Sequence, residues 1–173
     1  MTPVSATYEI LACKVLNRSV DKHWVDWAVE MIEAGFDSEN LIILAGENPP
    51  YNQFELKELT DKVLNDLYLD YSDRDRTIKN YVCHIVDKAL SGQTDTFKVL
   101  EIIKDLCIEI GYERYLMDFY LLYFTKTDLL YDDCQYHWTA SSVDRSNIDQ
   151  VILDYFKKWL ADNSLGRLLE IIV

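Results

Sequence analysis

The chain has 173 residues, 49% of them hydrophobic, and a formal net charge of -13 at pH 7. This length and apolar content predict one folded domain spanning residues 1–173 and exclude intrinsic disorder. The negative charge argues against nucleic acid and anionic membranes as partners, because like charges repel, and it favours a basic protein. The same acidity also fits a simple role in solubility.

Four cysteines lie far apart, without the spacing of a zinc site or a redox pair. We expect Cys13, Cys83, Cys107 and Cys134 to be reduced thiols in or near the core of a cytoplasmic protein. The N-terminal sequence lacks the basic and apolar regions of a signal peptide, and the longest apolar run, residues 119–124, is too short for a membrane span. No cofactor or metal is needed to hold such a chain together.

The first two predicted helices are residues 8–16 and 21–35. The second is apolar on most of its circumference, and Asp26, Glu30 and Glu33 form its one regular polar stripe. We therefore expect this helix to be central and covered on most sides. Its apolar flanks are Trp24, Trp27 and Met31 on one side and Val25, Ala28, Val29 and Ile32 on the other.

Capping residues and glycines mark the ends of the helices that follow. The pattern predicts helices over residues 39–45, 52–67 and 115–124. It also predicts one that Ser72 or Asp73 caps and that runs to residue 90, one that Thr94 or Asp95 opens and that runs to residue 110, and a last one that Asp144 or Ser146 caps and that runs to residue 160. The apolar positions expected inside the last helix are Ile148, Val151, Ile152, Tyr155, Trp159 and Leu160. Residues 127–142 are expected to be irregular, and residues 165–173 form an apolar tail that must dock or pair.

No strand-like alternation is long enough to make a sheet. The sequence therefore predicts an all-α fold, an antiparallel bundle of about seven to eight helices. Successive helix pairs also fit a stacked arrangement, although no fixed repeat period supports true repeats.

One segment resembles a recurrent pattern in small, uncharacterised bacterial proteins. The shared core reads LAG-x-x-PP-x-N-x-FE and is carried here by Leu44-Ala45-Gly46, Pro49-Pro50, Asn52 and Phe54-Glu55. The likeness covers the chain up to Asp70. It implies a bacterial origin and a helical fold, and it transfers no catalytic residue. These proteins loosely resemble the immunity proteins of toxin systems.

Motifs for catalysis are missing from the sequence. It contains no phosphate-binding glycine loop, no nucleophile elbow and no zinc-protease motif. The three histidines, His23, His84 and His137, lie on three different segments. We expect His84 to sit at the edge of an amphipathic helix rather than to form a nucleophilic pair with Cys83, and we expect His23 to flank the central helix.

The strongest candidate site is the acidic and aromatic loop of residues 128–138. Its candidate contact residues are Asp128, Tyr131, Asp132, Asp133, Tyr136, His137 and Trp138. We first expect the aromatic side chains to pack the loop onto the bundle while the aspartates stay in water. In the alternative interpretation the same aromatic side chains anchor a partner and the carboxylates select a basic one. A divalent-metal site of Asp128, Asp132, Asp133 and His137 is a further alternative.

A second candidate surface is the stiff loop of residues 47–53. It presents Asn48 and Tyr51 to a partner, or it is a rigid corner between two helices, and the corner is the simpler interpretation.

The sequence therefore favours a protein-binding module over an enzyme. Its concrete form is an immunity-like inhibitor of a basic toxin that uses the 128–138 loop and acidic helix edges such as Asp26, Glu30 and Glu33. The alternatives are a metal-dependent hydrolase built on the 128–137 aspartates and histidine, and a structural or regulatory subunit whose C-terminal tail makes an oligomer contact.

Overall fold

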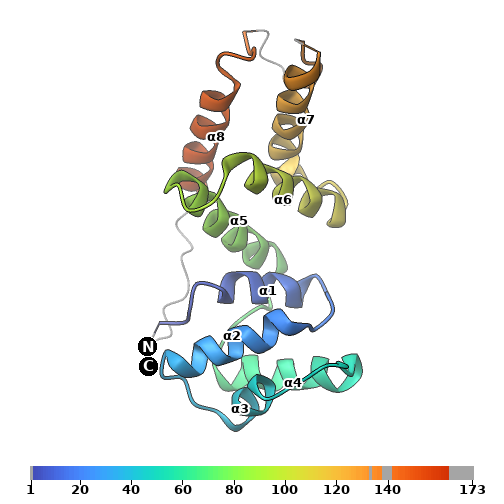
Figure 1. Ribbon diagram of the computed structural model, residues 1–173, viewed down its shortest axis with the longest axis vertical. Coiled ribbons are helices and arrows are strands. Elements are labelled where there is room, and N and C mark those ends of the chain that lie inside the picture. The colour runs from blue at the N-terminus through green and yellow to red at the C-terminus, as the bar shows by residue number, and fades with distance from the viewer. Residues whose placement is uncertain (1, 133, 138–141, 164–173) are drawn as a thin grey trace. The chain divides into compact units, whose positions relative to one another are not determined.

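A computed structural model describes residues 2–132, 134–137 and 142–163 of the chain (Figure 1). Within these ranges the fold is all-α, with no strand, which confirms the predicted fold class. The elements are α1 (Thr7–Val15), α2 (Lys22–Glu33), α3 (Glu39–Ala45), α4 (Gln53–Asp66), α5 (Arg74–Leu90), α6 (Thr96–Glu109), the 3-10 helix η1 (Arg114–Leu116), α7 (Met117–Tyr131) and α8 (Ile148–Asn163). No helix in the described ranges has the length and apolarity needed to cross a membrane.

The described chain divides into two compact units. One comprises residues 2–81 and the other residues 82–163, so the division falls inside α5. The assignment of the chain to a single domain stays a prediction. The predicted apolar tail, residues 165–173, lies outside the described residues.

The core of the first unit is built around α2. Asp21 accepts a hydrogen bond from the backbone N–H of His23 and so caps the helix as predicted. Trp24 and Trp27 are buried and meet edge to face, with ring centroids 6.0 Å apart. The same cluster includes Ile10, Met31, Leu41, Leu44, Leu56, Val63 and Leu64. α3 packs against both α2 and α4, which closes this core.

The expectation that α2 is covered on most sides is only partly correct. Its tryptophan flank is buried, and the polar stripe of Asp26, Glu30 and Glu33 is exposed as predicted. Val29 and Ile32, however, keep 41% and 37% of their surface exposed. Both α1 and α3 contact α2, and the tryptophan side of α2 lies in one buried cluster with residues of α1, α3 and α4. α2 is therefore an amphipathic helix with one exposed face, and it is not enclosed on most sides.

Most helix ends lie where the sequence predicts them. Side-chain oxygens of four capping residues accept hydrogen bonds from the first turns of α3, α4, α5 and α6: Ser38, Asn52, Asp73 and Asp95. Gly35 follows α2 with a φ of 93°, a backbone conformation that favours glycine. Local capping chemistry thus decides most of the element boundaries.

The core of the second unit is aromatic. Phe119 of α7 lies against three rings of α8, with centroid distances of 5.0 Å to Tyr155, 5.7 Å to Phe156 and 5.0 Å to Trp159. Phe156 is fully buried, although the sequence pattern did not assign it to the core. Val151, which the pattern did assign, is half-buried.

α7 is longer than predicted. The sequence predicts an end at residue 124 and irregular structure over residues 127–142, but the helix continues to Tyr131. The hydroxyls of Thr125 and Thr127 donate to the carbonyls of Leu121 and Tyr123 one turn back, which is compatible with helical backbone. Leu129 is buried and continues the apolar face. Threonines that look like helix breakers in sequence therefore lie inside the helix.

The cysteines, all of which the structure describes, form no disulfide. Cys107 is buried, and Cys13 and Cys83 are half-buried, in line with thiols in or near the core. Cys134 is exposed, so the expectation fails for that residue, which lies beyond the end of α7 rather than on a core helix.

Candidate functional site

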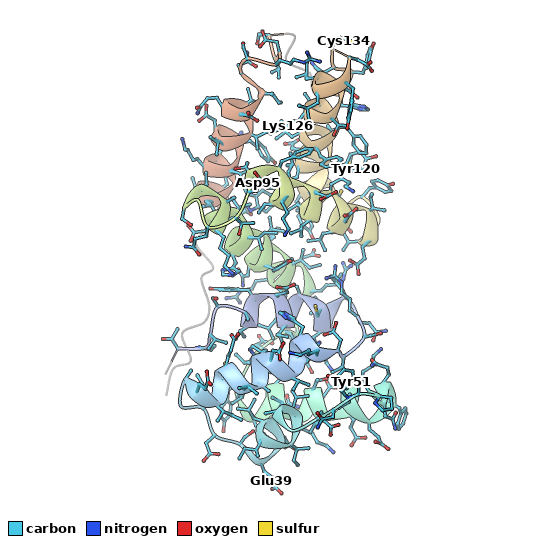
Figure 2. All side chains as sticks on the ribbon, in the orientation of Figure 1. Glu39, Tyr51, Asp95, Tyr120, Lys126 and Cys134 are labelled. Atoms are coloured by element: carbon cyan, nitrogen blue, oxygen red, sulfur yellow. The ribbon has the colours of Figure 1, made fainter. Side chains whose placement is uncertain are left out.

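The 128–138 loop is the end of one helix and the segment that follows it. We call its described residues, 128–132 and 134–137, the acidic aromatic tip. Figure 2 shows Cys134 beyond the last turn of α7, at the end of the second unit's helices. Asp133 and Trp138, two of the predicted contact residues, lie outside the described residues.

Asp128 ties the segment after α7 back to the helix. One of its carboxylate oxygens accepts a hydrogen bond from the backbone N–H of Tyr136 at 3.3 Å. The same oxygen lies 3.5 Å from Nε2 of His137. The His137 ring also contacts Phe124, with centroids 5.5 Å apart. Asp128 therefore positions the tip, and the structure brings Asp128 and His137 together across nine residues of sequence.

Arg145 closes the C-terminal end of α7. Its guanidinium donates to the carbonyl of Leu129 and, at 3.0 Å, to the carbonyl of Leu130. The last carbonyls of a helix have no partner within the helix, and the negative end of the helix dipole favours a cation there. Arg145 was not singled out from the sequence, because its partners are backbone groups.

The aromatic side chains of the tip point into solvent. Tyr131 is 80% exposed and Tyr136 is 77% exposed, with Leu130 also exposed beside Tyr131 in sequence. The first interpretation, in which these rings pack the loop onto the bundle, is therefore wrong for both tyrosines. Asp132 is exposed as expected. What remains is an ordered backbone that presents two tyrosines to water.

The Tyr136 hydroxyl has a defined neighbour. Cys134 Sγ lies 3.1 Å from the Tyr136 hydroxyl oxygen, within hydrogen-bonding distance, and this contact is the first of the causes that raise the pKa of Tyr136 above its ordinary value. The hydroxyl is therefore neutral at physiological pH and keeps its proton for donation to a partner.

Metal ligands do not gather in the part of the chain that the structure describes. No three His, Cys, Asp or Glu side chains there come close enough to hold an ion. Asp128 and His137 are paired, Asp132 is an exposed side chain that lies between them in sequence, and Asp133 lies outside the described ranges.

The second predicted surface, the loop of residues 47–53, is a corner. The Asn48 side chain donates to the carbonyl of Gly46 at 2.9 Å, which holds the turn after α3. Tyr51 is half-buried and packs against the core of the first unit at the start of α4 (Figure 2). The local roles of both residues favour the rigid-corner interpretation.

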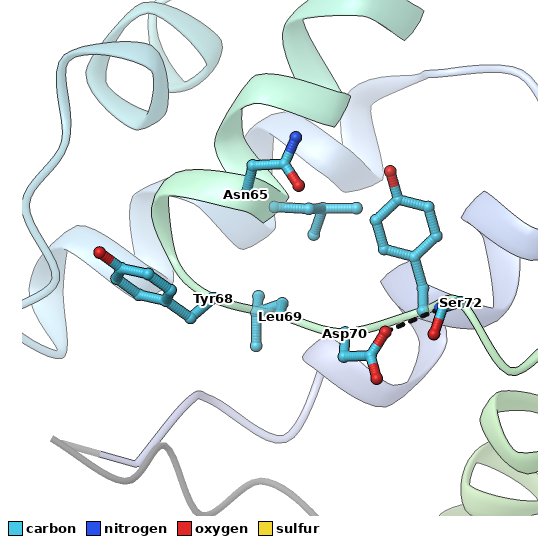
Figure 3. A pocket seen from close by; sticks show the side chains of 7 residues that line it. Asn65, Tyr68, Leu69, Asp70 and Ser72 are labelled. Carbon is cyan, nitrogen blue, oxygen red and sulfur yellow. Dashed lines mark hydrogen bonds between the residues drawn. The ribbon is translucent and has the colours of Figure 1, made fainter.

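A surface pocket that the sequence reading missed lies after α4. Its cavity volume is about 500 Å³, and it is lined by Leu64, Asn65, Tyr68, Leu69, Asp70, Tyr71 and Ser72. Figure 3 shows Asn65 on the helix side and the chain from Tyr68 to Ser72 along the other side. We call this the Tyr68 pocket. The sequence pattern predicts only a polar break between helices for part of this stretch.

Tyr68 has an unusual backbone for its residue type. Its φ is 53°, and the bonds from Tyr68 N to Asn65 O and from Leu69 N to Leu64 O close the C-terminal end of α4. Glycine is the usual residue at this position, because a side chain is strained in the left-handed region. The Tyr68 side chain is nevertheless 85% exposed.

The other polar side chains of the pocket are anchored. The Tyr71 hydroxyl donates to Asp61 at 2.6 Å, and Asp61 pairs with Lys14 at 2.8 Å. Burial, followed by the Asp61 hydrogen bond, raises the pKa of Tyr71 to about 12. The Asp70 carboxylate accepts from the backbone N–H of Ser72 at 2.9 Å, and hydrogen bonds from Ser72 lower its pKa. Asp70 is therefore ionised at neutral pH and stays ionised well below it.

Comparison with known proteins adds no relative: no family model matches the sequence, no curated protein matches it, and no solved structure matches its fold. The resemblance of the LAG-x-x-PP-x-N-x-FE segment to small bacterial proteins therefore stays a prediction.

Proposed function

We propose that this protein binds another protein, a basic one, through the acidic aromatic tip. The observation that carries the proposal is the exposure of Tyr131 and Tyr136 on a backbone that Asp128 and Arg145 hold in place. Tyrosine offers a large rigid contact surface with few side-chain torsions to immobilise, and it is enriched among residues that dominate binding energy.

Preorganisation supports the same conclusion. A tip whose backbone is already tied to α7 loses little conformational entropy when a partner covers it. The Asp128 hydrogen bond and the Arg145 contacts with the carbonyls of α7 supply that restraint. Exposed rings in such a setting have no folding role that accounts for their position.

Charge supports a basic partner. The chain carries 30 acidic against 17 basic residues, and Asp132 is exposed within the tip itself. Complementary charge speeds encounter with a cationic surface and disfavours acidic competitors. The more specific proposal is that the partner is a toxin and that the protein acts as an immunity-like inhibitor covering its active site. The toxin-system resemblance and the missing catalytic motifs support this step.

The test is capture of partners from an extract of the organism that encodes the protein. The double variant Tyr131→Ser/Tyr136→Ser should lose the basic partner that the unaltered chain retains. A matched control, Phe54→Ser/Tyr112→Ser, removes two other exposed aromatic side chains and should retain it. Capture should also weaken between about 50 mM and about 500 mM salt, because salt screens exposed charges. Equal capture by both double variants, or capture that is insensitive to salt, would rule out the tip as the binding surface.

A metal-dependent hydrolase remains the alternative, and the pairing of Asp128 with His137 is the observation in its favour. Thermal melts with and without Mg²⁺, Mn²⁺ and Zn²⁺ separate the two proposals. A metal that binds the folded state raises the unfolding midpoint with ion concentration, and Asp128→Asn should abolish that rise. A midpoint that no ion moves leaves the protein-binding proposal as the better one.

A further inference from the structure

We propose that the Tyr68 pocket is a second binding site, specific for an arginine side chain of a partner protein. It lies in the first unit and shares no residue with the acidic aromatic tip. The inference therefore does not depend on the proposed function, and the variants that test the two surfaces are different.

The pocket offers an apolar floor and aromatic walls. Leu64 and Leu69 are buried residues at its base, while Tyr68 and Tyr71 contribute rings at its edge. The methylene stem of an arginine packs on aliphatic surface, and its planar guanidinium stacks on an aromatic face. These are the two apolar contacts that an arginine side chain makes and that a small anion does not.

The polar lining has the matching charge. Asp70 is the one ionised group among the lining residues, and hydrogen bonds from Ser72 lower its pKa, so it stays a carboxylate over the physiological range. Asn65 adds an amide oxygen on the helix side (Figure 3). The charge of Arg76 also lowers the pKa of Asp70, but it is the smallest of the contributing causes. A guanidinium presents a planar fork of donors to a carboxylate such as Asp70, which a lysine ammonium cannot reproduce.

The backbone of Tyr68 is the second independent indication. A tyrosine at a φ of 53° is strained, and its 85% exposure means that burial of the ring does not offset the strain. The Tyr71 ring at the same pocket is held by Asp61, so its position is fixed before a ligand arrives. Asn17 and Tyr112 also have positive φ, so the conformation supports a binding site at Tyr68 because the Tyr68 side chain lines a pocket.

The test uses N-acetyl-arginine amide as the probe, titrated into the full chain while backbone amide resonances are recorded. We expect saturable shifts that centre on residues 64–72, with weak affinity on the order of millimolar because the probe is small. N-acetyl-citrulline amide has the same shape without the charge and should not bind. N-acetyl-lysine amide keeps the charge without the planar fork and should bind at least about threefold more weakly.

Two variants assign the contacts. Tyr68→Gly relieves the backbone strain, so it keeps the fold while removing the ring, and should weaken arginine binding about threefold. Asp70→Asn keeps the side-chain shape and should weaken binding by a similar factor. The matched controls are Tyr112→Gly, another exposed tyrosine with positive φ at 61°, and Asp75→Asn, an exposed aspartate that does not line the pocket. Both controls should bind arginine as the unaltered chain does.

Three results would overturn the assignment. Shifts of equal size with the citrulline probe would show that charge has no part in binding. Equal affinity for the lysine probe would show that the pocket is not specific for a guanidinium. Unchanged affinity in both Tyr68→Gly and Asp70→Asn would place the site elsewhere. The tip variant Tyr131→Ser/Tyr136→Ser should leave arginine binding intact, so failure of one proposal does not produce failure of the other.

Discussion

A single buried hydroxyl matters to the core of the first unit. Thr7 is fully buried, and its oxygen accepts a hydrogen bond from Nε1 of Trp27 at 2.9 Å. The Thr7 hydroxyl in turn points to the sulfur of Met31 at 3.8 Å. Thr7→Val keeps the shape of the side chain but leaves the indole N–H buried without an acceptor. We expect the free energy of unfolding to fall by about 1 to 3 kcal/mol, measured by urea denaturation.

Thr125→Val is the matched control for that prediction. Thr125 is also fully buried, but its hydroxyl only donates to the carbonyl of Leu121 on its own helix. That carbonyl also accepts the regular backbone bond of α7, so the change should cost less than about 1 kcal/mol. Similar losses in the two variants would show that the indole hydrogen bond has no special value.

His84 makes stability depend on pH. Burial, then the nearby Lys88, lowers its pKa from an ordinary 6.5 to about 4. The unfolded chain takes up a proton near pH 6.5, whereas the folded chain takes it up only near pH 4. Stability that is complete above pH 6.5 is therefore lost progressively as the pH falls toward 4.

The substitution His84→Gln should flatten this part of the pH profile. The measurement is the urea midpoint of both proteins between about pH 7.5 and about pH 4.5, a range that spans most of the His84 transition. Asp61, Asp70 and Asp144 have lowered pKa values, so the stability that they contribute is lost only at lower pH. A profile that is equally steep with and without His84 would assign the loss to other groups.

At the scale of the element, the helix ends divide into relaxed and strained ones. Gly92 follows α5 at a φ of 74° with open space where a Cβ would stand, whereas Tyr68 follows α4 at 53° with a full side chain. Tyr68→Gly should raise the free energy of unfolding by about 1 kcal/mol, and Gly92→Ala should lower it by about the same amount. Thermal or urea unfolding measures both. A destabilised Tyr68→Gly protein would mean that the exposed ring contributes to folding after all.

Local chemistry explains why most elements could be predicted. Side chains such as Ser38, Asn52 and Asp95 accept hydrogen bonds from the first turn that follows them, and this choice needs no tertiary information. The end of α7 could not be predicted in the same way. Thr125 and Thr127 lower helix propensity in isolation, and tertiary burial of Leu129 outweighs that preference.

The candidate site was predictable in place but not in detail. A run of tyrosines and aspartates near residue 131 marked the tip, yet sequence alone does not say whether a ring faces the core or water. The Tyr68 pocket was harder to predict, because its lining includes a tyrosine in a backbone conformation that sequence patterns assign to glycine. A tyrosine directly after a predicted helix, where glycine is usual, is the signal that was available.

At the scale of the whole molecule, excess negative charge lowers the stability of the fold and strengthens the binding of a basic partner. The chain has 30 acidic and 17 basic residues, so ion pairs such as Lys14–Asp61 and Lys126–Asp149 cannot neutralise all of its carboxylates. Repulsion among the remaining carboxylates opposes the compact state, so added salt should stabilise the fold modestly. Loss of partner binding at high salt therefore reports on the interface and not on unfolding.

The two compact units are expected to unfold together, because the division between them falls inside one continuous helix, α5. Ile78 and Tyr81 of α5 are buried and belong to the first unit, and Val82 and Val86 are buried and belong to the second. If one unit unfolds, half of α5 loses the packing that offsets its conformational entropy, and the hydrogen-bonded helix transmits that loss. A single cooperative transition is the outcome that the single-domain prediction requires.

The test places the reporter in one unit and the perturbation in the other. Trp138→Phe/Trp159→Phe leaves Trp24 and Trp27 as the remaining tryptophans, so fluorescence follows the first unit. Ile103→Val, in the buried core of the second unit, should cost about 1 kcal/mol. In a coupled molecule this change lowers the fluorescence midpoint and the circular-dichroism midpoint equally, as Ile10→Val in the first unit should also do. A fluorescence midpoint that Ile103→Val leaves unmoved, while circular dichroism shows an earlier transition, would divide the chain into two domains at α5.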